Sequence, residues 1–306
     1  MRPSHPLGAR AARVVAQSKV NLVLRVLARE ASGFHQIETL FQRLELGDDI
    51  RVDVSGSSRT LACRGADTGP PERNLAWRAA LAYADRTGWP RAFAIEIDKR
   101  VPVGGGLGGG SADAGAVLRC LNALAPAPLP PTGLLELAAR LGSDVPFLTA
   151  ELPLALAWGR GERMLALPVL PARPVRLAVF ATGVSTADAY AWLAESRGLS
   201  PAPDPTLLSI GDFATWDAVA AVAHNDFEAV VIPRHPGVAA VLTRLRGGKG
   251  ARGIALMSGS GATIFAIDEL ASARDEPNAE WFDTSAALRF VTTGTAAAVP
   301  PIDLVE

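Results

Sequence analysis

The densest concentration of residues suited to chemistry is a glycine run at 104–111, where six of eight residues are glycine and the last is Ser111. Glycine at that density costs backbone entropy and builds no core, so we expect backbone N–H groups to approach a ligand closely here. The following segment, 111–125, has apolar residues at helical spacing, so the run ends at a helix N-terminus that favours negative charge. This pattern predicts a phosphate-binding loop.

Two common phosphate-binding motifs fit this run poorly. Gly104, Gly106 and Gly109 satisfy the dinucleotide pattern G-x-G-x-x-G, but no acidic residue stands at the tip of a second strand about 20 residues further on. The Walker A pattern fails because Gly110 stands where a lysine is required. The loop therefore belongs to another class of nucleotide site.

The elements around the loop predict a mixed α+β protein. Segment 92–99 alternates apolar and polar residues as a half-buried strand does, and it leads into the loop. Because strands and helices do not alternate strictly, the order favours α+β over a doubly wound sheet. The expected strands are 13–27, 40–54 (a pair turning at 47–49), 92–99, 154–167 (a pair turning at 159–161), 175–180, 253–258, 263–267 and a final one at 286–293. The expected helices are 74–87, 111–125, 132–141, 186–195, 213–223, 225–231 and 237–245.

Length and composition set the broad class. The 306 residues suit one large or two ordinary domains, and the proline-rich stretch 168–174 predicts a boundary between domains 1–167 and 168–306. A net charge of -1 without a local Lys/Arg cluster argues against nucleic acid, and no long apolar run predicts a membrane span. Two cysteines without metal-site spacing favour a reducing, cytoplasmic setting. Monomer and homodimer both stay open.

Three motifs in order, at 18–21, 102–111 and 257–262, resemble the GHMP kinases, a superfamily of small-molecule kinases. Motifs at 33–42, 46–48, 141–147 and 225–228 resemble the branch whose acceptor is a cytidine diphosphate conjugate of methylerythritol. The resemblance implies a two-lobed fold with the active site in the interlobe cleft. It also implies ATP and Mg²⁺ as cofactors, a small-molecule substrate, and a role in making isoprenoid precursors by the non-mevalonate route.

The resemblance places the catalytic pair on Lys19 and Asp144. Asp144 would take the proton of the acceptor hydroxyl, while Lys19 would keep Asp144 ionised and touch the γ-phosphate. Standing alone, Asp144 is equally typical of a helix N-cap. Asn74 and Lys99 match positions near the nucleotide, although they also suit a helix cap and a solvated strand end. The residues expected around ATP are Asn74, Lys99, Pro102, Gly104, Gly105, Gly106, Leu107, Gly108, Gly109, Gly110 and Ser111.

The acceptor site is expected from an aromatic pair and a second glycine cluster. Phe34 stands where the branch usually has tyrosine, so base stacking should persist without the hydroxyl, and His35 would hydrogen-bond the base. For the second stacking aromatic, Tyr190 is preferred to Trp192. Asn21, Gly259 and Gly261 would line the same substrate, and the metal ligands stay unknown.

Two alternative functions are weighed against this one. Another GHMP kinase, of the mevalonate or homoserine type, would not need the cytosine-recognition segment 33–35. A non-catalytic binding protein of the same fold would be expected to lack Lys19 or Asp144, and both are present.

Overall fold

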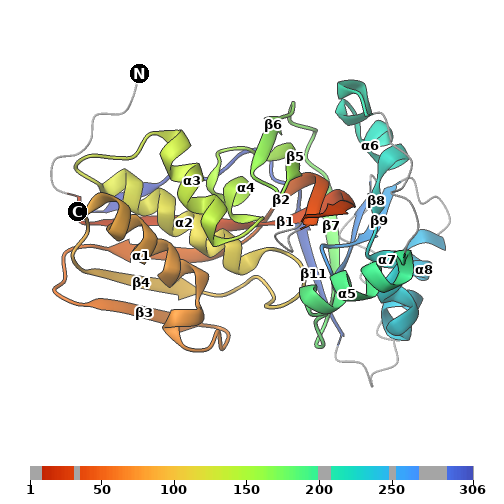
Figure 1. Cartoon of the computed structure of the whole chain (residues 1–306), viewed down its shortest axis with the longest axis horizontal. Helices are drawn as coiled ribbons and strands as arrows, with labels where there is room; N and C mark the ends of the chain where they lie inside the picture. Colours follow the sequence, from red (N-terminus) through yellow and green to blue (C-terminus); the bar gives the residue numbers. More distant parts are fainter. Residues whose placement is uncertain (1–8, 31–34, 199–207, 248–252, 269–287, 306) are drawn as a thin grey trace.

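Two β-sheets with helices packed on them make up the described chain (Figure 1). The computed structural model describes residues 9–30, 35–198, 208–247, 253–268 and 288–305. The larger sheet has the order β12-β1-β2-β4-β3, with β5 and β8 paired to β2 and β1 and β6 paired to β5. The smaller sheet has the order β11-β7-β10-β9. The mixed α+β class expected from the sequence is confirmed.

The strands of the larger sheet are β1 (Ala11–Arg29), β2 (His35–Asp53), β3 (Arg59–Arg64), β4 (Phe93–Asp98), β5 (Leu154–Gly159), β6 (Arg163–Ala166), β8 (His224–Asn225) and β12 (Asp303–Val305). Those of the smaller sheet are β7 (Pro174–Phe180), β9 (Gly253–Met257), β10 (Ile264–Asp268) and β11 (Leu288–Gly294). The helices are α1 (Leu75–Thr87), α2 (Gly109–Leu124), α3 (Pro131–Leu141), α4 (Val145–Thr149), α5 (Thr186–Arg197), α6 (Trp216–Val222), α7 (Glu228–Val231) and α8 (Pro236–Gly247), with 3-10 turns at Pro71–Arg73, Ile210–Phe213 and Ile232–Arg234.

The expected hairpin at 40–54 is wrong, because β2 runs through it as one strand paired along β1. Gly47 lies opposite Gln17, where a Cβ would come within 2.7 Å of the Ala16 carbonyl oxygen. Asp48 is fully buried and bonded to Lys99. The residues that suggested a turn therefore serve a close backbone approach and a buried ion pair.

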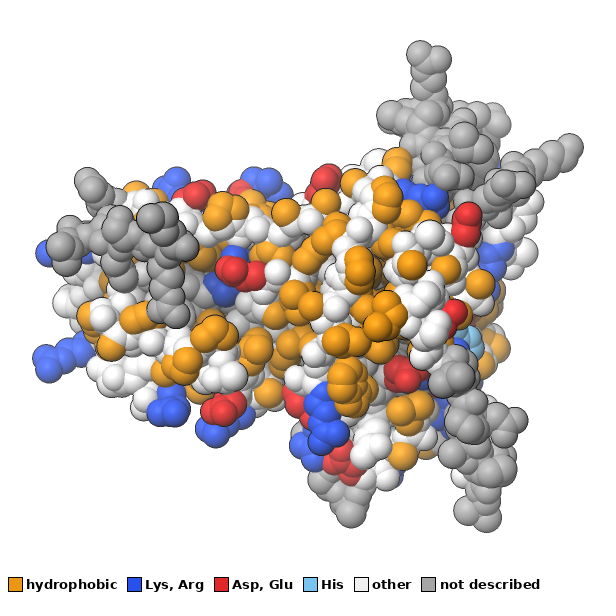
Figure 2. Space-filling model, turned by 90° about the horizontal axis from the view of Figure 1, so that it is seen from above, with side chains coloured by type: hydrophobic (Ala, Val, Ile, Leu, Met, Phe, Trp, Pro, Cys, Tyr) orange, Lys and Arg blue, Asp and Glu red, His pale blue; other side chains and the backbone are white. Residues whose placement is uncertain are grey.

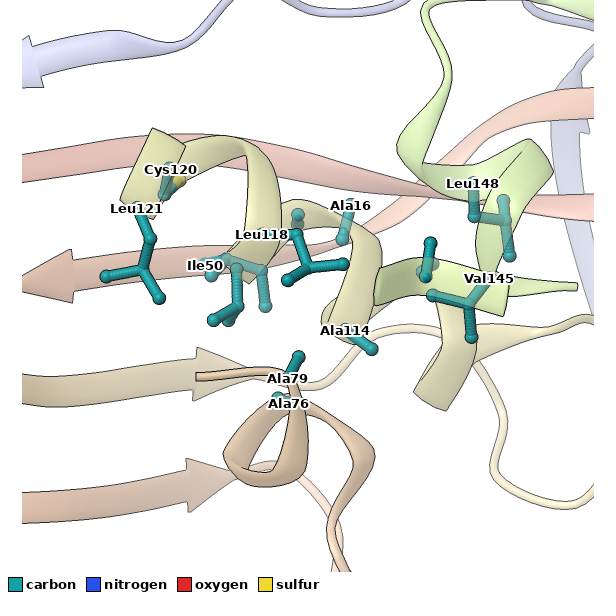
Figure 3. Packing of buried hydrophobic residues seen from close by; sticks show 14 of the residues in the cluster. Ala16, Ile50, Ala76, Ala79, Ala114, Leu118, Cys120, Leu121, Val145 and Leu148 are labelled. Atoms are coloured by element: carbon teal, nitrogen blue, oxygen red, sulfur yellow. The ribbon is translucent and has the colours of Figure 1, made fainter. Parts of the chain in front are cut away.

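Helices α1 to α4 pack with the larger sheet around one hydrophobic core (Figure 1). Helix α2 is central to it, since most of its residues are buried. Figure 3 shows Leu118 and Leu121 of α2 in this cluster with Ile50 of β2, and Val145 and Leu148 of α4 beside them. Gly115 lets α2 approach α4 closely, because a Cβ there would lie 2.7 Å from Leu148 backbone atoms. This contact sets how closely α4 packs on α2.

The second sheet shares a core with the first. One buried cluster combines Val20 and Leu22 of β1 with Leu177 of β7 and Phe265 of β10. The expected final strand corresponds to β11, but β12 follows it and pairs with β1 in the first sheet. All strands of the smaller sheet therefore follow the expected division at 167/168, and most strands of the larger sheet precede it. The exceptions are β8 and β12, which follow the division but pair with β1 of the larger sheet.

The expected helix at 225–231 is also corrected. Asn225 belongs to β8, which pairs in parallel with β1, and the helix begins only at Glu228. The side chains of Asn225 and Asp226 bond to backbone groups far away in sequence, the Gly259 carbonyl oxygen and the Val26 N–H.

Helix length and surface charge of the described residues bear on membranes and on nucleic acid. Among the described residues no helix is long and apolar enough to cross a membrane. Figure 2 shows Lys/Arg and Asp/Glu side chains interspersed on this face, without a large patch of one sign.

Candidate active site

A cavity of about 520 Å³ opens between residues that precede position 168, here called the first part, and residues that follow it, here called the second part. From the first part come Lys19, Asn21, Asp144 and the loop 102–111, and from the second come Thr186, Tyr190, Phe227, Gly259 and Ser260. This volume is typical of small-molecule sites. All eleven residues expected around ATP line the cavity: Asn74, Lys99, Pro102, Gly104, Gly105, Gly106, Leu107, Gly108, Gly109, Gly110 and Ser111.

Lys19 and Asp144 form an ion pair in this cavity, with Nζ 3.2 Å from Oδ2. Lys19 stands beside an irregularity in the β1–β2 pairing and is 3% exposed. Its Nζ also donates to Asn21 Oδ1 at 2.7 Å and to the Gly106 carbonyl oxygen at 3.1 Å. These three partners use the donors of the ammonium group and fix its position.

Asp144 does not use its side chain as a helix cap. It precedes α4, yet its carboxylate makes no capping hydrogen bond, and the side chain is 29% exposed. The carboxylate therefore faces Lys19 and the cavity, where it can accept a proton. The two side chains place one carboxylate next to one fixed ammonium group on the cavity wall.

The glycine loop and the second glycine cluster pack on each other. A Cβ at Gly106 would lie 2.1 Å from the Ser258 carbonyl oxygen, and one at Gly105 would lie 2.4 Å from Thr263 Oγ1. Ser258 Oγ donates to the Gly106 carbonyl oxygen at 3.0 Å. Gly106 also has a φ of 78°, a conformation that favours glycine. The backbone of both segments thus forms one wall of the cavity, ahead of the α2 N-terminus.

A buried charged cluster lies beside the glycine loop, at one end of the cavity. Lys99 Nζ bonds Asp48 Oδ2 at 2.5 Å and Asp113 Oδ2 at 2.8 Å, and all three side chains are nearly inaccessible. Asp48 Oδ1 also accepts from the backbone N–H groups of Arg100 and Val101. The alternative interpretation of Lys99 as a solvated strand end is therefore wrong. The cluster fixes the strand end that leads into the glycine loop.

Burial and charge act against each other in this cluster. Burial raises the pKa of Asp113 to about 7, although Lys99 opposes the shift. For Lys99, burial lowers the pKa, but the two carboxylates outweigh it and the net pKa lies above its usual value. Lys99 is therefore charged at neutral pH, and the Asp113 carboxyl group is partly protonated near pH 7.

Asn74 caps α1, since its Oδ1 accepts from the Ala76 N–H at 2.9 Å, and it lines the cavity as well. Asn21 is committed within the protein, because its Nδ2 donates to Thr39 Oγ1 at 2.8 Å while its Oδ1 accepts from Lys19. Leu107 is buried, and its carbonyl oxygen accepts from the Lys19 N–H at 3.0 Å. These residues position the site's backbone and Lys19.

An aromatic pair lies at the other end of the cavity, which Tyr190 lines and His35 does not. The rings of His35 and Tyr190 stack with centroids 4.2 Å apart and planes 17° apart. Tyr190 lines the cavity, whereas Trp192 lies 5.0 Å from the Arg234 guanidinium and near His235. Phe34 lies outside the described residues. Burial raises the pKa of Tyr190 to about 12, with a contribution from Asp144.

Gly259 lines the cavity, and a Cβ built on it would lie 3.6 Å from Lys19 Nζ. Gly261 closes the same turn by donating its N–H to the Ser258 carbonyl oxygen at 3.0 Å. Sequence reasoning assigned no role to Asp48, Asp113 or Phe227, although the motifs at 46–48 and 225–228 include the first and the last of them. A signal existed for Asp113, which is an acid on an otherwise Ala/Leu-rich helix face.

The described residues contain no group of three or more His, Cys, Asp or Glu side chains placed to hold a metal ion. A magnesium ion that travels with nucleotide phosphates needs fewer protein ligands than that, because it keeps several waters and uses phosphate oxygens. Asp144 and the Ser111 hydroxyl supply oxygen donors on the cavity wall. The donor set is compatible with magnesium bound to a nucleotide.

Comparisons with known proteins show which family the chain resembles. The family model for the GHMP kinases N terminal domain matches residues 74–151. The chain is 38% identical over 287 residues to the 4-diphosphocytidyl-2-C-methyl-D-erythritol kinase of Geobacter sp. (strain M21), covering 91% of this chain and 98% of that protein. It is 44% identical over 260 residues to the enzyme of the same name from Anaeromyxobacter sp. (strain K), covering 83% and 79%.

Solved structures give the same result. A crystal structure of 4-(cytidine 5'-diphospho)-2C-methyl-D-erythritol kinase matches with a TM-score of 0.71 and 33% identity, covering 92% of this chain and 98% of that one. A homoserine kinase from Cytophaga hutchinsonii shares the fold, with a TM-score of 0.66 at 18% identity and coverage of 97% and 98%.

Fold and site together define a GHMP kinase, that is, a small-molecule kinase for which ATP is the phosphoryl donor. The sequence identities of 33–44% over most of the chain identify one family within this superfamily. The chain belongs to the family of 4-diphosphocytidyl-2-C-methyl-D-erythritol kinases.

Proposed function

We propose that the protein transfers the γ-phosphoryl group of ATP, with Mg²⁺, to a hydroxyl of 4-diphosphocytidyl-2-C-methyl-D-erythritol, on the non-mevalonate route to isoprenoid precursors. The observation that carries the proposal is the Lys19–Asp144 ion pair, 3.2 Å apart, beside the two packed glycine segments. The family membership supports the acceptor. The alternatives of the mevalonate or homoserine type share the fold but at much lower identity.

Asp144 acts as the proton acceptor in this proposal. As the acceptor oxygen bonds to phosphorus, its proton moves to an Asp144 carboxylate oxygen, and the bond between phosphorus and the ADP oxygen breaks. Lys19 keeps Asp144 ionised beforehand and balances negative charge on the transferring group. Backbone N–H groups of 104–111 and the α2 N-terminus favour the phosphates. Bound Mg²⁺ would add charge neutralisation, with Asp144 and Ser111 as the available oxygen donors.

Base recognition falls to the aromatic end of the site. The Tyr190 ring is flat and lines the cavity, and because His35 covers one of its faces, the proposed pyrimidine stacks on the other face. Burial, followed by the nearby Arg29 and Arg197 charges, lowers the pKa of His35 below its usual value. His35 is therefore neutral at pH 7, with one nitrogen that donates and one that accepts, which suits the edge of a cytosine. Phe34 precedes it in sequence and is proposed as the second stacking ring.

An acceptor-competition assay tests the proposal. The purified chain is incubated with ATP, Mg²⁺ and the cytidine conjugate, and ADP release is followed, with mevalonate and homoserine as control acceptors. We expect ADP release only with the cytidine conjugate. Asp144→Asn should lower kcat by roughly 10²–10⁴-fold while leaving both dissociation constants nearly unchanged. Turnover of a control acceptor instead of the cytidine conjugate would overturn the acceptor assignment, and near-normal kcat in Asp144→Asn would overturn the role of Asp144.

A further inference from the structure

The four residues Asn225–Asp226–Phe227–Glu228, here called the 225–228 motif, have no part in the mechanism above, yet each bonds to or packs against a part of the acceptor site. The motif lies on β1, the strand of Lys19, because β8 pairs with Val23 and Leu24. The Asp226 N–H continues this contact by donating to the Leu24 carbonyl oxygen at 2.9 Å. Because it contacts the strand of Lys19, the motif is a candidate for a group that positions the residues of the site.

Asn225 holds the second glycine cluster. Its Nδ2 donates to the carbonyl oxygens of Met257 and Gly259, at 2.7 and 2.8 Å, and its Oδ1 accepts from the Phe227 N–H at 2.9 Å. The side chain is 3% exposed, so these bonds are shielded from water. Gly259 in turn lies against Gly106, whose carbonyl oxygen receives Lys19 Nζ. Asn225 thus acts on the reacting end through the glycine wall.

Glu228 holds the same strand end from a second direction. Its Oε1 accepts from the Met257 N–H at 2.8 Å, and its Oε2 pairs with Arg246 at 2.8 Å. The backbone of Met257 is therefore bonded on its carbonyl side by Asn225 and on its N–H side by Glu228. These two bonds restrict the position of Met257 and of the turn 258–261 that follows it.

Asp226 holds the helix of Tyr190. Its Oδ2 accepts from the Val26 N–H and from Arg197 Nη2, both at 2.7 Å, and Arg197 ends α5. His224 lies 2.8 Å from Oδ1. Burial alone would raise the pKa of Asp226, but the bonds from His224, Val26 and Arg197 outweigh it and the pKa lies below its usual value. The carboxylate is therefore ionised at neutral pH and anchors α5 to β1.

Phe227 supports the stacking ring directly. Its ring meets Tyr190 edge-on, with centroids 4.9 Å apart and planes at 90°, and it is 2% exposed at the cavity wall. At the other end of α5, Thr186 Oγ1 lies 3.0 Å from Ser260 Oγ in the glycine cluster. The stacking helix and the glycine cluster are therefore linked to each other and to the same four residues.

We propose that the 225–228 motif is a positioning element with two separable functions: Asn225 and Glu228 set the glycine wall for phosphoryl transfer, and Asp226 sets Tyr190 for base recognition. The proposal rests on the proposed function, because it assigns each half of the motif to one part of that acceptor. None of the three polar side chains touches the reacting atoms. They act through Gly259 and through α5.

Steady-state kinetics can separate the two functions. Asn225→Asp keeps the bond to the Phe227 N–H but replaces both donated bonds by repulsion from two carbonyl oxygens. It should lower kcat by roughly tenfold or more, because small displacements at a reacting centre are costly, while changing the acceptor KM less than about twofold. Asp226→Asn should do the opposite, raising the acceptor KM by roughly tenfold, the order of one lost stacking contact, with little change in kcat.

A matched control and two milder variants keep the test decisive. The control Asp53→Asn removes an ion pair with Arg51 at a distant part of the larger sheet. The exposed fractions of Arg51 and Asp53 are 29% and 26%, comparable to the 30% and 15% of Arg197 and Asp226. This variant should change neither kcat nor the acceptor KM. If a first variant does not fold, Glu228→Gln replaces Asn225→Asp and Arg197→Met replaces Asp226→Asn, with the same expected split. Thermal unfolding and the ATP KM are measured for every variant.

Variants that change kcat and both KM values together, in proportion to their loss of stability, would show a purely structural motif and overturn the inference. The same holds if Asp226→Asn and Arg197→Met leave the acceptor KM unchanged. A wild-type chain that does not turn over the cytidine conjugate refutes the proposed function instead. In that case the split is measured with whichever alcohol it does phosphorylate, and an absent kcat effect in Asn225→Asp would then refute the positioning role on its own.

Discussion

Substituting Gly115 tests whether the packing of α2 against α4 sets the geometry of Asp144. A Cβ at this position would lie 2.7 Å from the Leu148 carbonyl carbon and oxygen and 2.9 Å from the Thr149 nitrogen. Ordinary contact begins near 3.4 Å, so in Gly115→Ala the helices must separate by about 0.7 Å. Because Asp144 directly precedes α4, that movement changes its distance to Lys19.

The expected loss follows from this displacement. Misplacement of a reacting group by an ångström costs roughly 10²-fold, so Gly115→Ala should lower kcat by roughly 10- to 50-fold. Overpacking should lower the free energy of unfolding by about 1–3 kcal/mol, partly offset by the better helix propensity of alanine. The ATP dissociation constant should hardly change, since the loop 102–111 precedes this contact.

Kinetics, ATP titration and urea unfolding measure these three quantities. The control is Gly133→Ala in α3, where the nearest atoms would lie at 3.6 Å, so the helix should gain about 0.5–1 kcal/mol and kcat should stay unchanged. If Gly115→Ala kept wild-type kcat despite its loss of stability, the α2–α4 contact would not control Asp144. If ATP affinity fell as much as kcat, the disturbance would be in the glycine loop instead.

Three further outcomes are expected. Tyr190→Ala should weaken acceptor binding by about 1–3 kcal/mol through lost stacking, with ATP affinity unchanged; equal losses of both in calorimetry would contradict the stacking role. Since burial raises the pKa of Asp113 to about 7, ionising Asp113 opposes folding above about pH 4, so the free energy of unfolding of Asp113→Asn minus that of wild type should rise from about pH 4 to pH 7 and stay constant above; urea unfolding that shows a constant difference across this range would refute it. Gly106→Ala should lower both ATP affinity and kcat, because its Cβ would lie 2.1 Å from the Ser258 carbonyl oxygen, whereas Gly104→Ala meets open space and should cost less; equal kinetic losses in the two variants would exclude the packing of the two glycine segments as the cause.

Local sequence signals predict the elements whose structure depends on local interactions. The capped helix at Asn74 and the hairpin at 159–161 are both found as expected, with α1, β5 and β6. The failures occur where distant contacts decide. Gly47 and Asp48 are typical turn residues, and they lie inside a strand because Ala16 approaches one and Lys99 neutralises the other. A turn signal cannot reveal a partner 51 residues away.

The residues of the site also differ in whether a local sequence signal or a tertiary contact reveals them. Lys19, Asp144 and the glycine loop carry motifs of their own, so the sequence indicates them, and the cavity brings them together. Asp113 has no motif, only the signal of an acid on an Ala/Leu-rich helix face, and its contacts with Lys99 and, through Lys99, with Asp48 appear in the structure alone. The His35–Tyr190 stack likewise joins residues far apart in the chain. Sequence patterns predict which residues carry the chemistry, while the residues that orient them depend on tertiary contacts.

The return of β12 to the first sheet has a consequence for the order in which the protein folds during synthesis. Residues 303–305 pair with residues 11–13 of β1, and two nearby bonds fix the returning segment: Gln17 Nε2 donates to the Ala298 carbonyl oxygen, and Arg119 Nη2 to that of Pro300. The strand that carries Lys19 thus keeps an unpaired edge at 11–13 until residue 305 has left the ribosome. Contacts so distant in sequence form slowly, so the nascent chain exposes this edge to other nascent chains until residues 303–305 have been made and paired.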